Sequence, residues 1–256
     1  MKKIFALIFL SLLAEPSLAA ETFKCSRQTP ARFQLEKPSV CDDRVIWRYD
    51  MEEMAKKDHA LFEKEVESNT RMTSNMGGAK FTFPSGVEKK VFRSSFMAGK
   101  KECLAHLIKK EEVHTMMNYY QGSLKSGEPL SSEEKDLFSE LGGKLYVRSL
   151  NYQYDFKKMP KEKIMDKVAE IIRTIEYAPG NVLIHCYGGI HRTGVVFGVM
   201  QKCLNKIPVE DVLNEYKCHV AWEDETKPGG YEIDNEVVIR EFPCERLNAS
   251  SPEKRE

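Results

Sequence analysis

The sequence predicts an α/β domain with a mainly parallel central sheet flanked by helices. Short apolar runs with strand-like composition alternate with longer segments in which apolar residues recur at helical spacing. The run NVLIH at 181–185 is almost entirely apolar, as expected for a strand that is buried on both faces. Alternation of this kind indicates parallel strands, because each helix crosses over the sheet between two of them.

The predicted elements follow one another from residue 91 to residue 220. Four segments have the composition of strands, namely 91–95, 113–120, 144–150 and 181–185. Five segments have helical composition or spacing, namely 97–110, the segment that starts at Ser131, 161–177, 192–206 and the segment from Pro208 to 220. Ser131 with Glu134 three positions later has the capping-box pattern of a helix N-terminus. Pro179 and Gly180 end the helix at 161–177.

The chain divides into four parts. Residues 1–20 are expected to be a signal peptide, and residues 21–85 an N-terminal extension with an exposed helix at 51–67. The α/β domain is placed at 86–247, and a flexible tail at 248–256.

The N-terminus has the three regions of a bacterial-type secretory signal. Lys2 and Lys3 precede an apolar run at 4–13, and small residues at 17–19 form a cleavage site. The run is too short for a transmembrane helix, although an uncleaved anchor is the alternative. We therefore expect a periplasmic or extracellular protein without a membrane anchor in its mature form. Its 37 basic and 38 acidic residues predict no nucleic-acid partner.

The seven cysteines all lie beyond the signal peptide, at 25, 41, 103, 186, 203, 218 and 244. In an oxidising compartment an odd number leaves one free thiol, and six cysteines can form up to three disulfides in fifteen pairings. Cys186 is the candidate for the free thiol, and Cys25 and Cys41 are candidates to hold the N-terminal extension. The alternative is that most of the cysteines are buried and reduced.

The stretch HCYGGIHRTG at 185–194 carries the chemistry. A buried strand delivers Cys186, and Arg192 opens the next helix. Gly188, Gly189 and Gly194 allow the backbone N–H groups to turn inward, which forms an anion nest at a helix N-terminus. Arg192 can grip two oxygens of a phosphate with its planar fork. The pattern predicts a cradle for a tetrahedral dianion.

The same positive surroundings stabilise a thiolate, so Cys186 is the predicted nucleophile. Attack on a phosphomonoester would give a phosphocysteine that water hydrolyses. The loop residues from Tyr187 to His191, which are Tyr187, Gly188, Gly189, Ile190 and His191, are the predicted substrate-binding residues. Thr193 would donate its hydroxyl to the departing sulfur, and His185 would order the loop from its strand end.

HCYGGIHRTG resembles the signature loop of the cysteine-dependent protein tyrosine phosphatase superfamily, over roughly residues 90 to 242. Its HRTG ending, FRSS at 92–95 and NEY at 214–216 resemble the atypical dual-specificity phosphatases of plants and fungi, which act on inositol phosphates. Exported bacterial members include the tyrosine-phosphatase-like phytases. The resemblance implies a protein tyrosine phosphatase-like fold, a catalytic domain at 86–247, Cys186 as nucleophile and Arg192 as phosphate clamp.

The resemblance also implies an aspartate that protonates the leaving oxygen. Asp155, on the predicted loop 151–160 and 31 residues before Cys186, is the best match, although the usual Trp-Pro-Asp surrounding is absent. Three other aspartates remain open, namely Asp166, Asp224 and Asp234. The choice depends on reach before acidity.

The expected substrate is an inositol polyphosphate such as phytate, because Lys157, Lys158 and His191 would place cations around the pocket. A protein tyrosine or dual-specificity phosphatase is the alternative. Two other classes are sulfur transfer of the rhodanese type and a non-catalytic module that binds phosphate esters. We predict no metal or nucleotide cofactor, because the sequence has no Walker loop, zinc-ligand cluster or HExxH stretch.

Overall fold

The computed structural model describes residues 38–41, 60, 74–120, 127–148, 159–220 and 231–248. Within these residues a five-stranded sheet has the strand order β1-β2-β5-β3-β4. In that order the strands are β1 (Gly77–Thr82), β2 (Glu88–Ser94), β5 (Asn181–His185), β3 (Val113–Asn118) and β4 (Leu145–Arg148). Only β1 and β2 pair antiparallel, and the other three pairings are parallel. The prediction of a mainly parallel sheet is confirmed.

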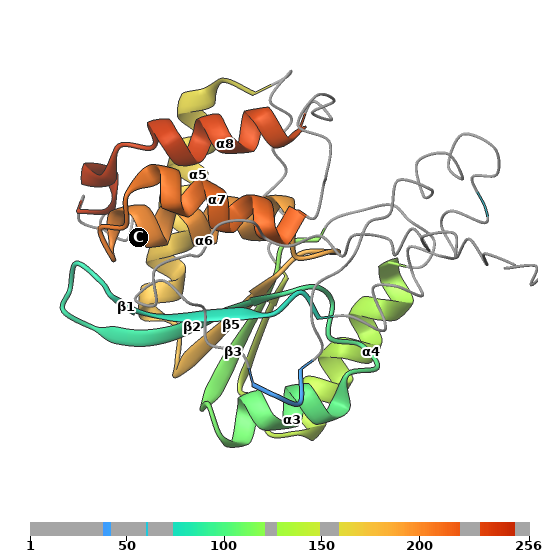
Figure 1. Ribbon diagram of the computed structural model, residues 1–256. Helices are drawn as coiled ribbons and strands as arrows, with labels where there is room; N and C mark the ends of the chain where they lie inside the picture. Colours follow the sequence, from blue (N-terminus) through green and yellow to red (C-terminus); the bar gives the residue numbers. More distant parts are fainter. Residues whose placement is uncertain are drawn as a thin grey trace, which may run out of the picture.

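Helices cover both faces of this sheet (Figure 1). The helices α3 (Lys101–Lys109) and α4 (Gly127–Glu140) lie on one face. Four helices lie on the other face, namely α5 (Lys161–Tyr177), α6 (His191–Cys203), α7 (Val209–Val220) and α8 (Tyr231–Glu241). A short 3₁₀ helix follows at Cys244–Leu247. The arrangement is a three-layer α/β domain.

The central strand β5 supplies both hydrophobic cores. Val182 and Ile184 pack in the core under α5 to α8, whereas Leu183 packs in the core under α3 and α4. All three side chains are fully buried. Successive side chains of a strand point to opposite faces, so a strand with helices on both sides must be apolar at every position. This explains why NVLIH has no polar alternation.

Several boundaries differ from the predictions. The sheet begins at Gly77, inside the range predicted as N-terminal extension, so the predicted domain boundary at residue 86 moves toward the N-terminus. The helix α4 begins at Gly127, so Ser131 and Glu134 lie inside it and form no capping box. The helix α8 was not predicted. The predicted helix at 51–67, apart from Ala60, and the predicted signal at 1–20 lie outside the described residues.

Two disulfides join distant parts of the domain. Cys41 is bonded to Cys103 in α3, and Cys203 at the end of α6 is bonded to Cys244. Cys186 is a free thiol, as predicted. Cys25 and the side chain of Cys218 lie outside the described residues.

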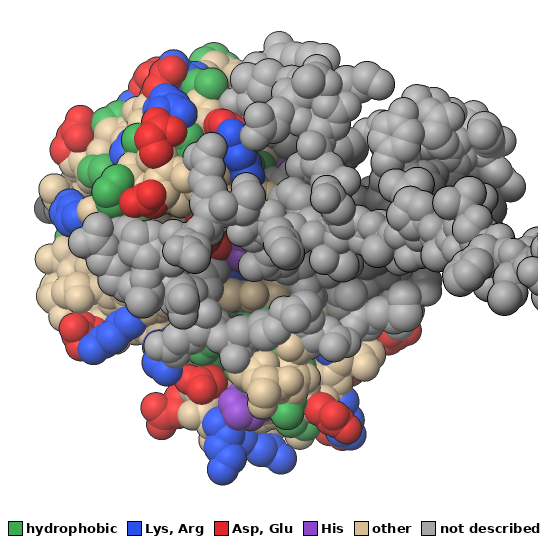
Figure 2. All heavy atoms as spheres, in the orientation of Figure 1, with side chains coloured by type: hydrophobic (Ala, Val, Ile, Leu, Met, Phe, Trp, Pro, Cys, Tyr) green, Lys and Arg blue, Asp and Glu red, His purple; other side chains and the backbone are tan. Residues whose placement is uncertain are grey.

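The surface of the described part carries both signs of charge. On the face drawn in Figure 2, acidic and basic side chains are interspersed. Among the described helices, none is long and apolar enough to cross a membrane.

Candidate active site

Cys186 lies where β5 ends, at the carboxyl edge of the parallel strands. β5 ends at His185, residues 186–190 form a tight loop, and α6 begins at His191. This is the strand, loop and helix order that the sequence predicted. Only 6% of Cys186 is exposed. Ligands of open α/β sheets bind outside this edge, so the loop is placed where a substrate can reach it.

The first two carbonyl groups of the loop are held by neighbouring strands. The Nδ1 atom of His185 lies 3.2 Å from the carbonyl oxygen of Cys186. The backbone N–H of Phe96, just after β2, donates to the carbonyl of Tyr187 at 3.0 Å. Both peptide groups are therefore turned with their oxygens toward the sheet side of the loop.

The next two carbonyl groups are held by buried side chains. The Nδ2 group of Asn75 donates to the carbonyl of Gly188 at 3.0 Å, and Nη2 of Arg93 donates to the carbonyl of Gly189 at 2.6 Å. A trans peptide group holds its C=O and N–H on opposite sides. The N–H groups of residues 187–190 therefore point away from all four donors. Within the described backbone none of these N–H groups donates to a carbonyl, so all four are available to a bound anion.

Gly189 is required by this geometry. Its φ angle is +71°, a left-handed conformation that glycine adopts without steric cost. A Cβ atom at this position would lie 2.4 Å from the backbone oxygen of Ser94. Close packing of the loop against β2 therefore excludes any side chain here.

Arg192 lies in the first turn of α6 and is partly exposed. Its Nη1 atom donates to the carbonyl of Tyr119 at 3.0 Å, and the N–H of Tyr119 donates in turn to the carbonyl of His185 at 2.7 Å. The residue after β3 thus fixes both the guanidinium and the strand end. A guanidinium with one arm anchored keeps the rest of its fork for a phosphate.

Thr193 is fully buried. Within the described residues its Oγ1 atom has no hydrogen-bond partner. A buried hydroxyl without a partner is costly, which is consistent with a role toward the sulfur or a bound substrate. That role remains a prediction.

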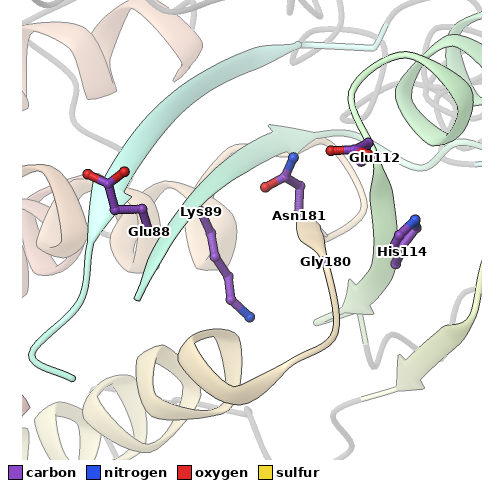
Figure 3. Close-up of a pocket in the computed structure, with 6 residues that line it drawn as sticks. All are labelled: Glu88, Lys89, Glu112, His114, Gly180 and Asn181. Carbon is purple, nitrogen blue, oxygen red and sulfur yellow. The ribbon is translucent and has the colours of Figure 1, made fainter. Parts of the chain in front are cut away.

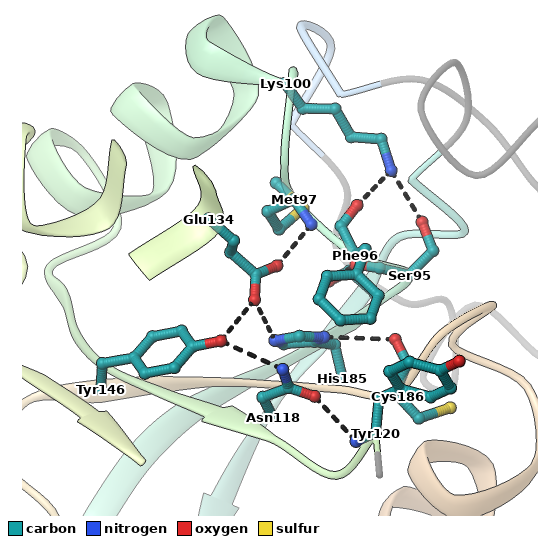
Figure 4. Close-up of polar contacts among 11 residues, drawn as sticks. Ser95, Phe96, Met97, Lys100, Asn118, Tyr120, Glu134, Tyr146, His185 and Cys186 are labelled. Carbon is teal, nitrogen blue, oxygen red and sulfur yellow. Dashed lines mark hydrogen bonds and ion pairs between the residues drawn. The ribbon is translucent and has the colours of Figure 1, made fainter. Parts of the chain in front are cut away.

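His185 belongs to a buried polar network behind the nucleophile (Figure 4). Its Nε2 atom lies 3.0 Å from Oε2 of Glu134 in α4. Glu134 also accepts hydrogen bonds from the N–H of Met97 at 2.6 Å and from the hydroxyl of Tyr146 at 2.9 Å. The predicted ordering role of His185 thus has a structural basis that reaches across the sheet.

The predicted acid and the predicted lysines lie outside the described residues, as Asp155, Lys157 and Lys158 fall within 151–158. Asp224 and the side chain of Asp234 also lie outside them. Asp166 is described, and it forms an ion pair with Arg246 on the exposed side of α5. His191 is partly exposed at the start of α6.

A second, polar pocket lies at the opposite edge of the sheet (Figure 3). Its lining residues sit at or before the amino ends of the strands, and are Glu88, Lys89, Glu112, His114, Gly180 and Asn181. Burial lowers the pKa of Lys89, while Glu176 acts in the opposite direction. The length of β5 separates this pocket from Cys186, so it is not the site of the predicted chemistry. The described residues contain no cluster suited to a metal ion.

Sequence reasoning did not assign roles to Asn75, Arg93 and Glu134. Arg93 lies in FRSS, which was used only for the resemblance, and its contact with the loop joins residues 96 positions apart. Glu134 was assigned to a helix cap. Only the burial of these polar residues, which no local pattern shows, marks them as part of the site.

Comparison with known proteins agrees with this geometry. The family model described as "Tyrosine phosphatase family" matches residues 81–227, more than half of the chain. No curated protein matches the chain significantly.

The solved structures that match the chain include two phosphatases. The catalytic core of the PP-IP phosphatase SIW14 from S. cerevisiae is 17% identical, and the match covers 67% of this chain and 88% of that chain with a TM-score of 0.44. TpbA from P. aeruginosa, in complex with pTyr, is 18% identical, with 62% and 83% covered and a TM-score of 0.41. On the strength of the family match, the chain belongs to the tyrosine phosphatase family and is a cysteine-dependent phosphatase.

Proposed function

We propose that the protein is an exported phosphomonoester hydrolase that acts on inositol polyphosphates such as phytate through a phosphocysteine intermediate. The observation that carries the reaction is the loop itself. Four backbone N–H groups face away from the donors that hold their carbonyls, next to a free thiol and an anchored Arg192. This arrangement fits a phosphoryl group in flight between two oxygens or between sulfur and oxygen.

In the first step the thiolate of Cys186 attacks phosphorus in line with the ester bond. The P–S bond forms, the P–O ester bond breaks, and the leaving oxygen takes a proton from an acid. We assign this acid to Asp155. In the second step water attacks phosphorus, gives its proton to the same carboxylate and releases inorganic phosphate and the thiolate. The loop N–H groups and Arg192 bind the equatorial oxygens in both steps.

The proposed substrate class follows from the cations around the loop. Arg192 and His191 are both partly exposed at its rim. Lys157 and Lys158 flank the proposed acid in the sequence. A substrate with several phosphates needs positive groups beyond those that bind the reacting phosphate, and this set supplies them.

Export is supported by the disulfides. Bonds such as Cys41–Cys103 and Cys203–Cys244 persist in oxidising compartments and are rare in the reducing cytosol. Together with the signal-like N-terminus they favour a periplasmic or extracellular site of action. Sequencing the N-terminus of the exported protein tests this: we expect loss of the first 20 residues, and a protein retained in the cytosol would contradict export.

A protein tyrosine or dual-specificity phosphatase is the second candidate. Tyr187 follows the nucleophile directly and is partly exposed, and its ring lies 5.0 Å from that of Tyr120 and 5.8 Å from that of Phe96. An aromatic group at the loop favours an aromatic leaving group, since rings stack at such distances.

A phosphate-release panel separates the two candidates. The wild-type protein and Cys186→Ser are assayed with phytate, lower inositol phosphates, a phosphotyrosine peptide and a small aryl phosphate. We expect release from phytate by the wild type and none by the variant. Release from the peptide with none from phytate would contradict the substrate assignment and favour the second candidate.

The lysine pair gives a sharper test of substrate class. Lys157→Gln combined with Lys158→Gln should lower kcat/KM for phytate about tenfold and leave the small aryl phosphate nearly unchanged, because only the polyphosphate needs the extra cations. Lys109→Gln combined with Lys110→Gln removes the same charge from the exposed end of α3 and serves as the control. Equal losses on both substrates would contradict the proposal.

A further inference from the structure

Asn75 has an unusual position for a polar residue. It precedes β1, has a φ angle of +46° and is fully buried. Its amide donates to two carbonyls from distant parts of the chain, that of Gly188 at 3.0 Å and that of His219 at 3.2 Å. A left-handed asparagine without exposed surface is conformationally costly unless its contacts compensate. Its contacts join the phosphate loop to the end of α7.

Arg93 is the second donor behind the loop. It is fully buried in β2, and its Nη2 atom donates to the carbonyl of Gly189. Its guanidinium carbon lies 5.7 Å from the ring centroid of Phe197 in α6, within the range of a cation–π contact. Its Nη1 atom lies 4.0 Å from Oε2 of Glu215. The guanidinium is thus held from two sides while it holds the loop.

His219 connects the two donors. Its Nδ1 atom lies 2.7 Å from Oδ1 of Asn75, and its Nε2 atom lies 2.7 Å from Oε1 of Glu215. The amide of Asn75 donates elsewhere, so the oxygen facing His219 is an acceptor, and the carboxylate of Glu215 is an acceptor too. Both ring nitrogens must then donate, which makes His219 an imidazolium. Asn75, His219, Glu215 and Arg93 form one continuous buried chain, called the anchoring cluster below.

We propose that Asn75 and Arg93 are positioning residues of the phosphate-binding loop and that the anchoring cluster holds its N–H groups toward the substrate. Fixing the carbonyls of Gly188 and Gly189 fixes the peptide planes to which the N–H groups of Gly189 and Ile190 belong. The cluster touches no reacting atom and acts through the loop alone. This inference rests on the proposed function only in that the loop binds a phosphoryl group.

Release of either carbonyl should let its peptide plane rotate and turn an N–H away from the phosphate. Preorganised donors contribute because they need no rearrangement when charge develops, and small misplacements are costly. The cluster therefore predicts an effect on phosphate affinity and on turnover that exceeds any effect on overall stability.

The test uses Asn75→Gly, because glycine accepts the positive φ angle and adds no charge. Three quantities are measured, namely kcat/KM for a small aryl phosphate, the inhibition constant of inorganic phosphate, and the phosphate concentration that half-protects Cys186 from iodoacetamide. We expect kcat/KM to fall about 10- to 100-fold. Both phosphate constants should rise about tenfold.

Asn181→Gly is the matched control. Asn181 also donates to a remote carbonyl, that of Glu111 at 2.6 Å, and accepts from the N–H of Lys90 at 2.9 Å, but at the opposite edge of the sheet. It should lower stability while its kinetic and phosphate constants stay within about twofold of wild type. Arg93→Lys, which keeps the charge but not the fork, should lie between wild type and Asn75→Gly.

Two results overturn the inference. One is a folded Asn75→Gly protein whose kcat/KM and phosphate constants stay within twofold of wild type, and the other is an equal loss in Asn181→Gly. A wild-type protein that neither binds phosphate nor hydrolyses the aryl phosphate would overturn the proposed function as well. Turnover of the aryl phosphate without turnover of phytate would overturn only the substrate class.

Discussion

The Nε2 atom of His185 lies 3.0 Å from Oε2 of Glu134, and neither side chain has any exposed surface. The other ring nitrogen faces the carbonyl of the nucleophile, Cys186. A helix on one face of the sheet is thereby connected to the catalytic loop at the edge of that sheet. The pair is costly to break, because removal of one partner leaves the other buried without compensation.

Glu134→Ala should therefore lower the free energy of unfolding by about 3–5 kcal/mol, as seen when one partner of a buried pair is removed. The N–H of Met97 and the hydroxyl of Tyr146 would lose their acceptor as well. Urea unfolding measures the change. Glu133→Ala, at the exposed neighbouring position, is the control and should stay within about 0.5 kcal/mol of wild type. Similar values for the two variants would contradict the role of the buried pair.

Gly189→Ala should abolish most of the activity. The new Cβ atom would meet the backbone oxygen of Ser94 at 2.4 Å, so the loop or β2 must move. We expect kcat/KM for an aryl phosphate to fall at least about 100-fold, since a shift of about 1 Å in a preorganised site has this effect. Gly86→Ala is the control, because Gly86 also has a positive φ angle but has no neighbouring atom within 4 Å. A Gly189→Ala protein with wild-type kinetics would refute the tight loop geometry.

The parts of the fold that depend on local pattern were predictable. β5, the loop at 186–190 and α6 follow from a short apolar run, clustered glycines and a helical apolar stretch. β1 was missed because Gly77 and Gly78 resemble a turn, and its pairing with β2 is what makes it a strand. α8 was missed because its charged residues interrupt the apolar spacing, and it is stabilised by packing against α6.

The site itself was predictable only where its residues are neighbours in sequence. Cys186, Arg192 and Thr193 share ten residues, so the sequence alone places them together. The anchoring cluster joins Asn75 to His219 across 144 positions. FRSS and NEY resembled family motifs, but only the structure shows that Arg93 and Glu215 of these motifs approach each other behind the loop.

The disulfide between Cys203 and Cys244 should contribute stability without affecting catalysis. It closes a segment with a sequence separation of 41 residues, and the combined Cys203→Ala and Cys244→Ala change should lower the free energy of unfolding by about 2–5 kcal/mol. Cys203 ends α6 and Cys186 precedes it, about 20 Å away along the helix. We expect kcat/KM within about twofold of wild type under native conditions. Unchanged stability, or a large kinetic defect in the folded variant, would contradict this assignment.

Lys89 should make stability increase with pH in the alkaline range. Burial lowers its pKa in the folded state below the ordinary value of 10.5, with Glu176 opposing the shift. Between these two values the unfolded chain binds more protons, so the contribution of Lys89 to the free energy of unfolding rises with pH. Urea unfolding of wild type and Lys89→Met at several pH values up to 10.5 tests this. The wild-type value minus the variant value should increase with pH, and a decrease would contradict the assigned direction.

The central claim is that Cys186 carries the phosphoryl group during turnover. Its most direct test is rapid acid quenching of the wild-type protein with a ³²P-labelled aryl phosphate, followed by mapping of the labelled peptide by mass spectrometry. We predict label on the thiol of Cys186, none on any other residue, and neither label nor phosphate release in Cys186→Ser. Phosphate release at the wild-type rate by Cys186→Ser, or label on a different residue, would contradict the account.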